Sequence, residues 1–274
     1  MYPVNLPSGI GLEAAGKIIE IGSGVKDLSV GDNVAYAGGV PSAYAEERIL
    51  PALLGVKIPD GISHKVAACI MTKGLTTHYL LCKTYKLTSK DTVLFHAAAG
   101  GVGQVFSQWA KGIGCKLIGT VGSDDKIAIA KENGCDHVIN YTKNDFVKEV
   151  KDITKGLGVS VVYDGVGKNT FKGSVQCLQS RGMMVSFGNA SGPLDPLDVP
   201  KDLQFKSLFF TRPTMKDYYT SRDEVVEGSK KLFEQIKFGK IKVKIFKEYA
   251  LADAKQAHID LESRKINGPA IFTI

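Results

Sequence analysis

The sequence predicts an α/β protein in which a doubly wound parallel sheet is inserted into a smaller, β-rich domain. Short apolar runs alternate with amphipathic stretches from Thr92 to about Pro213, which is the pattern of repeated βαβ units. The residues before this region are rich in glycine and proline and hold short strand-like runs separated by turns. A glycine-rich loop directly follows the first apolar run. These three observations together predict two domains.

Length and composition are those of a globular protein with room for two domains. The chain has 274 residues, of which 44% are hydrophobic and 23% are charged. No apolar run approaches the ~20 residues of a membrane-spanning helix, and the N-terminus lacks the basic and apolar regions of a secretory signal. We therefore expect a cytoplasmic protein with no membrane partner.

Cysteines, histidines and charges give no sign of a metal, a disulfide framework or a nucleic-acid partner. The five cysteines and five histidines are widely spaced and form no local ligand cluster, so we expect reduced, mostly buried thiols and no metal. The formal charge of +7 comes from lysines interleaved with acids along the chain. Such charges are typical of solvated helix faces, and a nucleic-acid partner is not expected.

Residues 1–75 are expected to form an antiparallel, barrel-like part of the β-rich domain, and residues 215–274 are expected to return to it. In the first segment the candidate strands cover 16–22, 32–37 and 43–50. In the second segment we expect a helix over 221–238, a strand over 241–250, a helix over 251–265 and a strand over 269–274.

Residues 76–214 are expected to form the doubly wound domain. The expected strands, most of them rich in valine, isoleucine or phenylalanine, are 92–97, 116–121, 137–140, 159–164, 182–188 and 207–211. Helical stretches lie between them. Gly114, Gly134 and Gly156 each follow such a stretch, where a left-handed C-cap favours glycine.

The loop "HAAAGGVGQ" (96–104) lies between the first expected strand and the first expected helix of this domain. Read as G-x-G-x-x-G, it has Ala98, Gly100 and Gly103 at the three glycine positions. Gly100 allows the backbone to approach a pyrophosphate, and Gly103 allows the helix to pack against the strand. The N–H groups at the helix start then face the anion. A glycine turn used only for packing is the alternative, but the strand–loop–helix context favours dinucleotide binding.

The second strand indicates which dinucleotide is bound. Folds specific for NAD place an acid at the end of this strand to bind the ribose 2′-hydroxyl, whereas here the strand ends "IGTVG". Asp124 and Asp125 come slightly later and are expected at the start of the next helix. Lys126 and Tyr141 can bind a 2′-phosphate, so NADPH is favoured over NADH. An ordinary surface position is the alternative for Lys126.

Several segments taken together resemble one known family. They are "LPSGIGLEAAG", "VGDNVAY", "HAAAGGVGQ", "VINY", "VSFGNASG" and "TRP". They resemble the quinone oxidoreductases, the zeta-crystallin-like branch of the medium-chain dehydrogenase/reductase superfamily, from about Tyr2 to the C-terminus. The resemblance implies an NADP-binding Rossmann domain (76–214) inserted into a GroES-like substrate domain. It also implies a homodimer that reduces quinones with NADPH and without a metal.

The segment "GLEAAG" bears on the metal. Zinc-dependent members of the superfamily carry G-H-E-x-x-G, whose histidine is a zinc ligand, and here Leu12 stands at that position. Leucine cannot bind zinc, so a zinc-independent enzyme is expected. Glu13 is then expected to be a structural carboxylate, kept ionised by backbone or basic partners.

The resemblance also implies individual site residues. Gly122, Lys126 and Tyr141 would hold the 2′-phosphate end of NADPH. The residues implied for the rest of the cofactor site are Thr76, Ala99, Gly100, Gly101, Val102, Gly103, Val166, Phe187, Gly188, Asn189, Ala190, Thr211 and Pro213. Tyr2 and Arg212 are the candidates for catalysis, with Arg212 stabilising negative charge on the quinone oxygen. A structural arginine in a strand-edge loop is the alternative for Arg212.

Two further expectations follow from the resemblance. Family members carry about fifty more residues before the position that matches Tyr2, so we expect an incomplete and poorly stable substrate domain with unpaired strand edges. Two other functions stay open. One is an NADPH-dependent enoyl or alkenal reductase, and the other is a non-catalytic, crystallin-like NADPH-binding protein.

Overall fold

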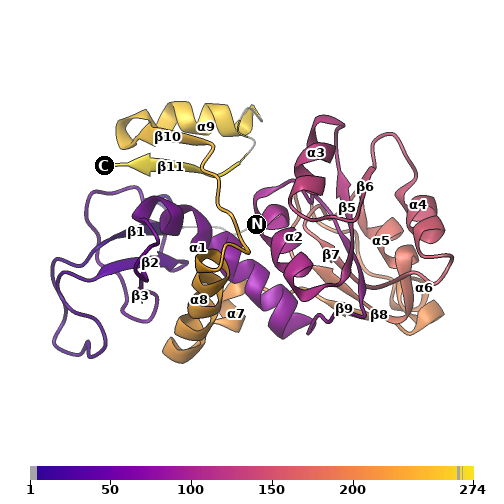
Figure 1. Ribbon diagram of the computed structural model, residues 1–274, viewed down its shortest axis with the longest axis horizontal. Helices are drawn as coiled ribbons and strands as arrows, with labels where there is room; N and C mark the ends of the chain where they lie inside the picture. The colour runs from indigo at the N-terminus through magenta and orange to yellow at the C-terminus, as the bar shows by residue number, and fades with distance from the viewer. Residues whose placement is uncertain (1–4, 264–265, 267) are drawn as a thin grey trace. The chain divides into compact units, whose positions relative to one another are not determined.

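The computed structural model describes residues 5–263, 266 and 268–274. The chain forms two compact units (Figure 1). We call Met1–Thr76 with Tyr218–Ile274 the terminal unit, and Thr77–Asp217 the central unit. The first division falls inside helix α1 (His64–Tyr79).

The central unit is built on a six-stranded sheet with the order β6-β5-β4-β7-β8-β9. Its strands are β4 (Thr92–Phe95), β5 (Lys116–Val121), β6 (His137–Asn140), β7 (Val159–Asp164), β8 (Leu178–Ser186) and β9 (Phe209–Thr211). All neighbouring strands are parallel. Counted within the sheet, the order is 3-2-1-4-5-6, that of the doubly wound dinucleotide-binding fold. The predicted fold class is therefore confirmed.

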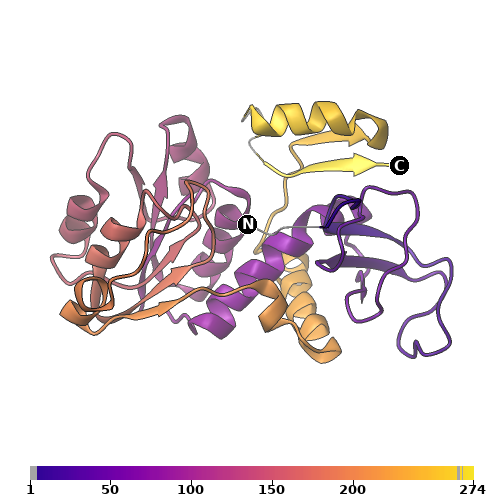
Figure 2. The same ribbon diagram turned by 180° about the vertical axis from the view of Figure 1, so that it is seen from behind.

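Helices cover both faces of this sheet. They are α2 (Gly101–Ile113), α3 (Asp125–Glu132), α4 (Phe146–Ile153) and α5 (Phe171–Cys177). Further along the chain come the short α6 (Val199–Asp202), a 3-10 turn over Gln204–Lys206 and α7 (Met215–Tyr218), which spans the boundary between the units. Both views show α2 and α3 on one face and α4 and α5 on the other (Figures 1 and 2). Such cover buries both faces of the sheet, which is why its strands are continuous apolar runs. Leu94, Ile118, Val162 and Met184 are fully buried between the layers.

Helix α2 of the central unit ends at a predicted glycine. Gly114 is the C-cap of α2, with φ +88°, and its N–H donates to the carbonyls of Ala110 and Lys111. A residue with a Cβ is strained in this left-handed conformation, so glycine is the favoured residue there. This confirms the predicted end of the first helix.

The cysteines are free thiols, as predicted from their spacing. Burial raises the pKa of Cys115 and Cys177 to about 12, and that of Cys69 and Cys135 to about 11. These four thiols therefore stay protonated at neutral pH and are poor nucleophiles.

The described residues of the terminal unit form two small sheets, most of α1 and the later helices α8 (Arg222–Lys237) and α9 (Ala254–Glu262). Strands β1 (Glu13–Lys17), β2 (Asn33–Ala37) and β3 (Val56–Lys57) pair antiparallel, as predicted for this part of the chain. The later elements are α8, β10 (Lys247–Ala250), a 3-10 turn over Leu251–Asp253, α9 and β11 (Ala270–Thr273). Strands β10 and β11 pair in parallel. A π-helical turn, Leu80–Thr84, follows α1 in the central unit.

Three strands expected in the terminal unit differ from the structure. The strand expected over 16–22 is β1, which begins and ends earlier because only Glu13–Lys17 align with β2. The strand expected over 241–250 is limited to β10. Residues 43–50 form no strand, and the Arg48 guanidinium in this segment instead donates to the Tyr36 hydroxyl at 2.8 Å. The expectation of a strand over 43–50 was therefore wrong, because a short run bounded by turns does not by itself supply a partner strand.

Over the parts of the chain that the structure describes, no helix is long and apolar enough to cross a membrane.

Candidate functional site

The loop after β4 is shaped by the close approach of helix α2 to the strand end. Ala97 has a φ of +59°, and Gly100 is the N-cap of α2. A Cβ on Gly103 would lie 2.5 Å from the Ala97 carbonyl oxygen and 2.6 Å from that of Ala98. No side chain fits there, so glycine is required for the packing of helix on strand that the sequence predicted.

The N-terminus of α2 presents backbone donors at the carboxyl end of the sheet. The first bond of the helix runs from the Gln104 N–H to the Gly100 carbonyl, 2.9 Å. The N–H groups of Gly101, Val102 and Gly103 donate to no other described residue. The first turn also carries no acid. Such a helix start favours an anionic group.

Gly122 and Tyr141 follow the neighbouring strands β5 and β6 and lie side by side. A Cβ on Gly122 would lie 3.3 Å from the Tyr141 hydroxyl oxygen, and the Tyr141 N–H donates to the Val121 carbonyl at 3.1 Å. Lys126 is the second residue of α3, and its ammonium group has no hydrogen-bond or ion-pair partner in the described part of the chain. We call Gly122, Lys126 and Tyr141 the β5–β6 corner.

Asp124 precedes α3 as its N-cap residue, and Asp125 begins the helix, as expected from the sequence. The Asp124 side chain makes no capping bond. It accepts a hydrogen bond from Asn140 at 2.6 Å and pairs with Lys143 at 2.5 Å. The hydrogen bond from Lys143, followed by that from Asn140, lowers the pKa of the Asp124 carboxyl.

The end of β7 carries a buried acid that the sequence interpretation missed. Asp164 is fully buried, and its carboxylate accepts hydrogen bonds from the N–H groups of Val166 (2.7 Å) and Gly167 (3.0 Å). It also accepts them from the hydroxyls of Thr170 (2.7 Å) and Ser174 (3.2 Å). These contacts fix the turn after β7. The available signal was an acid that ends an otherwise apolar strand and precedes "GVG".

His96 is buried beside this acid. Its Nδ1 lies 2.8 Å from the Thr120 hydroxyl, and its Nε2 lies 2.9 Å from the Ser174 hydroxyl. The single Ser174 proton has acceptors in Asp164 and in the Thr170 carbonyl (2.8 Å), so the Ser174 oxygen is left to accept from His96 Nε2–H. Burial lowers the pKa of His96, an effect that the Asp164 charge opposes, so the imidazole is neutral.

Arg212 holds the loop after β8. Its Nη1 donates to the Ser186 carbonyl (2.9 Å), the Ser186 hydroxyl (3.0 Å) and the Gly188 carbonyl (2.9 Å). The Asp164 carbonyl accepts hydrogen bonds from the N–H groups of Phe187 (2.9 Å) and Gly188 (3.3 Å). These bonds support the structural alternative for Arg212, and its catalytic role stays a prediction.

Hydrogen bonds therefore link the three loops that lie next to one another at the carboxyl end of the central sheet, between the end of β5 and the end of β9. We call the linked residues the polar chain, which consists of Thr120, His96, Ser174, Asp164, Gly188 and Arg212. The loops it joins follow β4, β7 and β8. In this fold the cofactor crevice lies outside the carboxyl ends of the strands, where the strand order reverses, which here is between β4 and β7.

The other predicted cofactor residues are distributed as follows. Val166 is buried, and its carbonyl accepts from the Ser191 N–H at 2.8 Å. Asn189 and Ala190 belong to the loop after β8, in which the Ala190 N–H donates to the Gly165 carbonyl at 3.2 Å. Thr211 ends β9, Pro213 is buried two residues later, and Ala99 accepts a hydrogen bond from the Gln104 side chain at 2.8 Å. Thr76 is buried in the terminal unit. Tyr2 lies outside the described residues.

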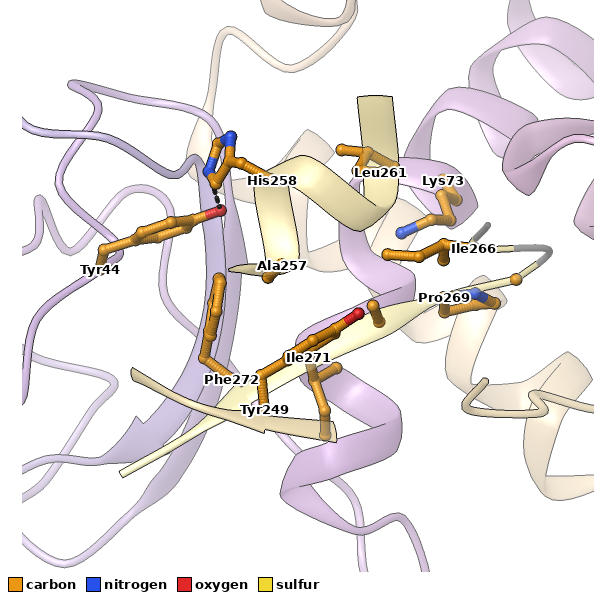
Figure 3. Close-up of a pocket in the computed structure, with 12 residues that line it drawn as sticks. Tyr44, Lys73, Tyr249, Ala257, His258, Leu261, Ile266, Pro269, Ile271 and Phe272 are labelled. Carbon is orange, nitrogen blue, oxygen red and sulfur yellow. Dashed lines mark hydrogen bonds between the residues drawn. The ribbon is translucent and has the colours of Figure 1, made fainter. Parts of the chain in front are cut away.

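A cavity of about 220 Å³ lies in the terminal unit (Figure 3). Tyr44, Tyr249, His258 and Phe272 line it, and the Tyr44 hydroxyl lies 3.2 Å from His258 Nε2. Among the described residues that line it are none of the predicted site residues. The cavity is also smaller than the ~300–1,000 Å³ of typical ligand pockets. It is therefore not the candidate cofactor site.

Glu13 has the partners expected of a structural carboxylate. Its Oε2 accepts a hydrogen bond from the Thr72 N–H at 2.8 Å, and the Lys73 ammonium lies 3.2 Å from its Oε1. Among the described histidine, cysteine, aspartate and glutamate residues, no group of three or more is arranged to hold a metal ion.

Comparison with known proteins identifies two matching families. Residues 1–89 match the alcohol dehydrogenase GroES-like domain, and residues 101–235 match the family described as zinc-binding dehydrogenase. Both families support the predicted arrangement of a β-rich domain and a doubly wound domain.

Individual relatives are more specific. The quinone oxidoreductase of Salmonella typhimurium is 48% identical over 272 residues, which cover 98% of this chain and 83% of the relative. The 2-haloacrylate reductase of a Burkholderia species is 41% identical, covering 97% of this chain and 81% of that protein. The crystal structure of Escherichia coli quinone oxidoreductase complexed with NADPH superposes with a TM-score of 0.95 at 45% identity, covering 99% of this chain and 84% of that one. The chain therefore belongs to the quinone oxidoreductase family of the medium-chain dehydrogenases/reductases.

Proposed function

We propose that the chain is an NADPH-dependent reductase of quinones. The observation that carries the proposal is the carboxyl end of the central sheet, where the donors of α2 and the β5–β6 corner follow neighbouring strands. The similar E. coli protein was crystallised with NADPH and is named a quinone oxidoreductase. When bound, NADPH supplies the hydride for a two-electron reduction of the quinone to the hydroquinone.

The loop after β4 suits the pyrophosphate. The N–H groups of Gly101, Val102 and Gly103 begin a helix that packs tightly on the strand end at Gly103, and the first turn of this helix carries no acid. We assign the pyrophosphate to these donors and to the backbone of Ala99 and Gly100.

The β5–β6 corner suits the 2′-phosphate. A phenol hydroxyl and an unpaired ammonium group are donors for a doubly charged anion, and Gly122 leaves room beside the Tyr141 hydroxyl. We assign the 2′-phosphate to Lys126, Tyr141 and Gly122.

The nicotinamide half is assigned to the loops joined by the polar chain. They contribute Val166 and the segment Phe187, Gly188, Asn189 and Ala190. We add Thr211, Pro213 and Thr76 to this set. Ordered loops exclude water and fix the orientation of a bound group, and this positioning is the main contribution that we expect from the protein.

Catalysis needs few protein groups. A quinone is electrophilic enough to accept a hydride without a metal, and the one proton that completes the hydroquinone can come from water. Tyr2 and Arg212 stay candidates to contact the substrate, with Arg212 also holding the loop after β8. We further propose that residues 76–214 are the cofactor domain and that residues 1–75 and 215–274 form the substrate domain.

We propose a homodimer in the cytoplasm. Strand β9 is at the edge of the central sheet, and the Phe209 and Phe205 side chains are 58% and 51% exposed. An apolar sheet edge of this kind is a surface for pairing with a second copy. Light scattering on the wild type and on Phe209→Lys tests this, with a dimer expected for the wild type and a monomer for the variant.

A second substrate class is supported by the 2-haloacrylate reductase, which is 41% identical to this chain. The two substrate classes are distinguished by steady-state measurement of NADPH oxidation with para- and ortho-quinones, a 2-haloacrylate and an alkenal. We expect the highest kcat/KM with a quinone. A higher kcat/KM with the alkenes would refute the quinone assignment and support the enoyl or alkenal reductase.

A further inference from the structure

An acid, Asp124, lies in the chain between Gly122 and Lys126 of the β5–β6 corner, shortly after the strand end at which an acid selects for NADH. Asp124 follows the end of β5 by three residues. An acid after this strand binds the 2′-hydroxyl of NADH, and its charge repels a 2′-phosphate. For the proposed NADPH site to bind a 2′-phosphate, the Asp124 charge must be neutralised or directed away from it.

Both carboxylate oxygens of Asp124 are engaged by residues at the end of β6. Oδ1 accepts from Asn140 Nδ2 at 2.6 Å, and Oδ2 lies 2.5 Å from the Lys143 ammonium. These residues flank Tyr141 in the sequence. The Asp124 carboxylate is thus directed to the β6 end and neutralised there.

The orientation of Asn140 is fixed by its other contacts. Its Oδ1 accepts hydrogen bonds from the Thr142 N–H at 3.1 Å and the Thr142 hydroxyl at 2.7 Å. With the amide oxygen held by two donors, the amide nitrogen is the end that faces Asp124. The Asn140 side chain is only 3% exposed, so this arrangement is held by packing as well.

We propose that Asn140 and Lys143 determine the cofactor preference of this chain by holding the Asp124 carboxylate away from the adenosine ribose. With Asp124 neutralised, the Lys126 ammonium, which has no ion-pair partner among the described residues, leaves the corner attractive to a 2′-phosphate. The inference rests on the proposed NADPH binding. Asn140 and Lys143 act through Asp124 and are positioning residues.

The stability of the protein depends little on the ion pair itself. The side chains of Lys143 and Asp124 are 65% and 56% exposed, and exposed pairs contribute little to folding. Lys143→Ala is therefore expected to fold normally while it releases the Asp124 charge. A freed carboxylate charge beside the proposed 2′-phosphate site should change the ratio of NADPH to NADH affinity about tenfold.

The test is calorimetric titration of the full chain with NADPH and with NADH at one salt concentration. We expect Lys143→Ala to lower the NADPH-to-NADH affinity ratio about tenfold, and Asn140→Ala/Lys143→Ala to lower it further. Adding Asp124→Asn to Lys143→Ala should restore the ratio, because no carboxylate is then left to repel the phosphate. Melting temperatures of all variants verify folding. If Asn140→Ala/Lys143→Ala does not fold, Lys143→Ala alone and Lys143→Ala with Asp124→Asn decide the outcome.

Two controls separate this effect from a general loss of positive charge. Lys148→Ala removes another exposed lysine, on α4, and should leave the ratio unchanged. Asp125→Asn should not rescue Lys143→Ala, because Asp125 is not the carboxylate that Lys143 holds. An unchanged ratio in Lys143→Ala, or equal rescue by Asp124→Asn and Asp125→Asn, overturns the inference alone. A wild-type chain that binds NADH as tightly as NADPH overturns the proposed cofactor and the inference together.

Discussion

The Nε2 atom of His96 lies 2.9 Å from the Ser174 hydroxyl, although 78 residues separate the two in the sequence. This contact joins the two halves of the polar chain. On one side are the loop after β4 and Thr120 of β5, and on the other are Asp164 and the loops after β7 and β8. The loops assigned to pyrophosphate and to nicotinamide are therefore supported by one continuous set of hydrogen bonds.

Removal of the Ser174 hydroxyl tests this support. In Ser174→Ala, His96 Nε2–H and one Asp164 oxygen lose a buried partner, which costs about 1–3 kcal/mol of unfolding free energy. Because both loops lose their common support, we expect NADPH to bind about tenfold more weakly, measured by calorimetric titration. Nitrogen NMR should also show the His96 Nε2–H tautomer in the wild type.

Ser107→Ala is the matched control, since Ser107 is also fully buried in the central unit but contacts Cys135 instead. Its NADPH affinity should stay at the wild-type value. If both variants bound NADPH equally well, the polar chain would have no positioning role.

The neutral state of His96 predicts an effect of pH on stability. Burial keeps the folded pKa of His96 below its ordinary value of 6.5, so only the unfolded chain gains a proton there as the pH falls. Folding stability from this group is therefore lost as the pH falls below 6.5. We expect the loss of unfolding free energy between about pH 7.5 and about pH 5.5 to be smaller in His96→Asn than in wild type. Equal losses in urea titrations of the two proteins would show that His96 is charged in the folded state.

Two glycines of α2 have opposite predicted effects when replaced by alanine. A Cβ on Gly103 would meet two backbone oxygens, whereas a Cβ on Gly112 would meet nothing within 4 Å. We expect Gly103→Ala to lose about 1–3 kcal/mol of unfolding free energy and most NADPH affinity, because the helix must move off the strand. Gly112→Ala should gain about 0.5–1 kcal/mol and keep its affinity. Thermal unfolding with and without NADPH measures both, and a neutral Gly103→Ala would contradict the assigned loop geometry.

Asp260 predicts an acid sensitivity in the terminal unit. Hydrogen bonds from the Tyr249 hydroxyl (2.7 Å), Lys247 (2.9 Å) and Gln256 (2.9 Å) lower its pKa from 3.8 to about 2. The stability from this carboxylate is present above the unfolded pKa of 3.8 and is lost as the pH falls toward about 2. We expect Asp260→Asn to be less stable at neutral pH and to lose less on acidification. Tyrosine fluorescence during acid titration measures the unfolding of both proteins. If Asp260→Asn lost stability with falling pH as steeply as the wild type, the acid sensitivity would belong to another group.

The elements of the central unit could be predicted because their signals are local. Buried parallel strands are continuous apolar runs, and the loop 96–104 combines a strand end, glycines and a helix start within nine residues. Asp164, His96 and Ser174 could not be assigned, since their partners are brought together only by the fold. The sequence showed Asp124 but not the Asn140 and Lys143 contacts that hold it. Residues 43–50 are bounded by turns like a strand, yet the turns do not specify a partner for pairing.

The most direct test of NADPH-dependent quinone reduction is a single-turnover measurement. The chain is mixed with an equimolar amount of NADPH and then, without oxygen, with a para-quinone, while NADPH absorbance and hydroquinone formation are followed together. We expect NADPH to be consumed and hydroquinone to form in equal molar amounts, since one hydride and one proton complete the two-electron reduction. NADH should react more slowly under the same conditions. NADPH that binds but is oxidised by no quinone would contradict the proposed activity and support the non-catalytic alternative.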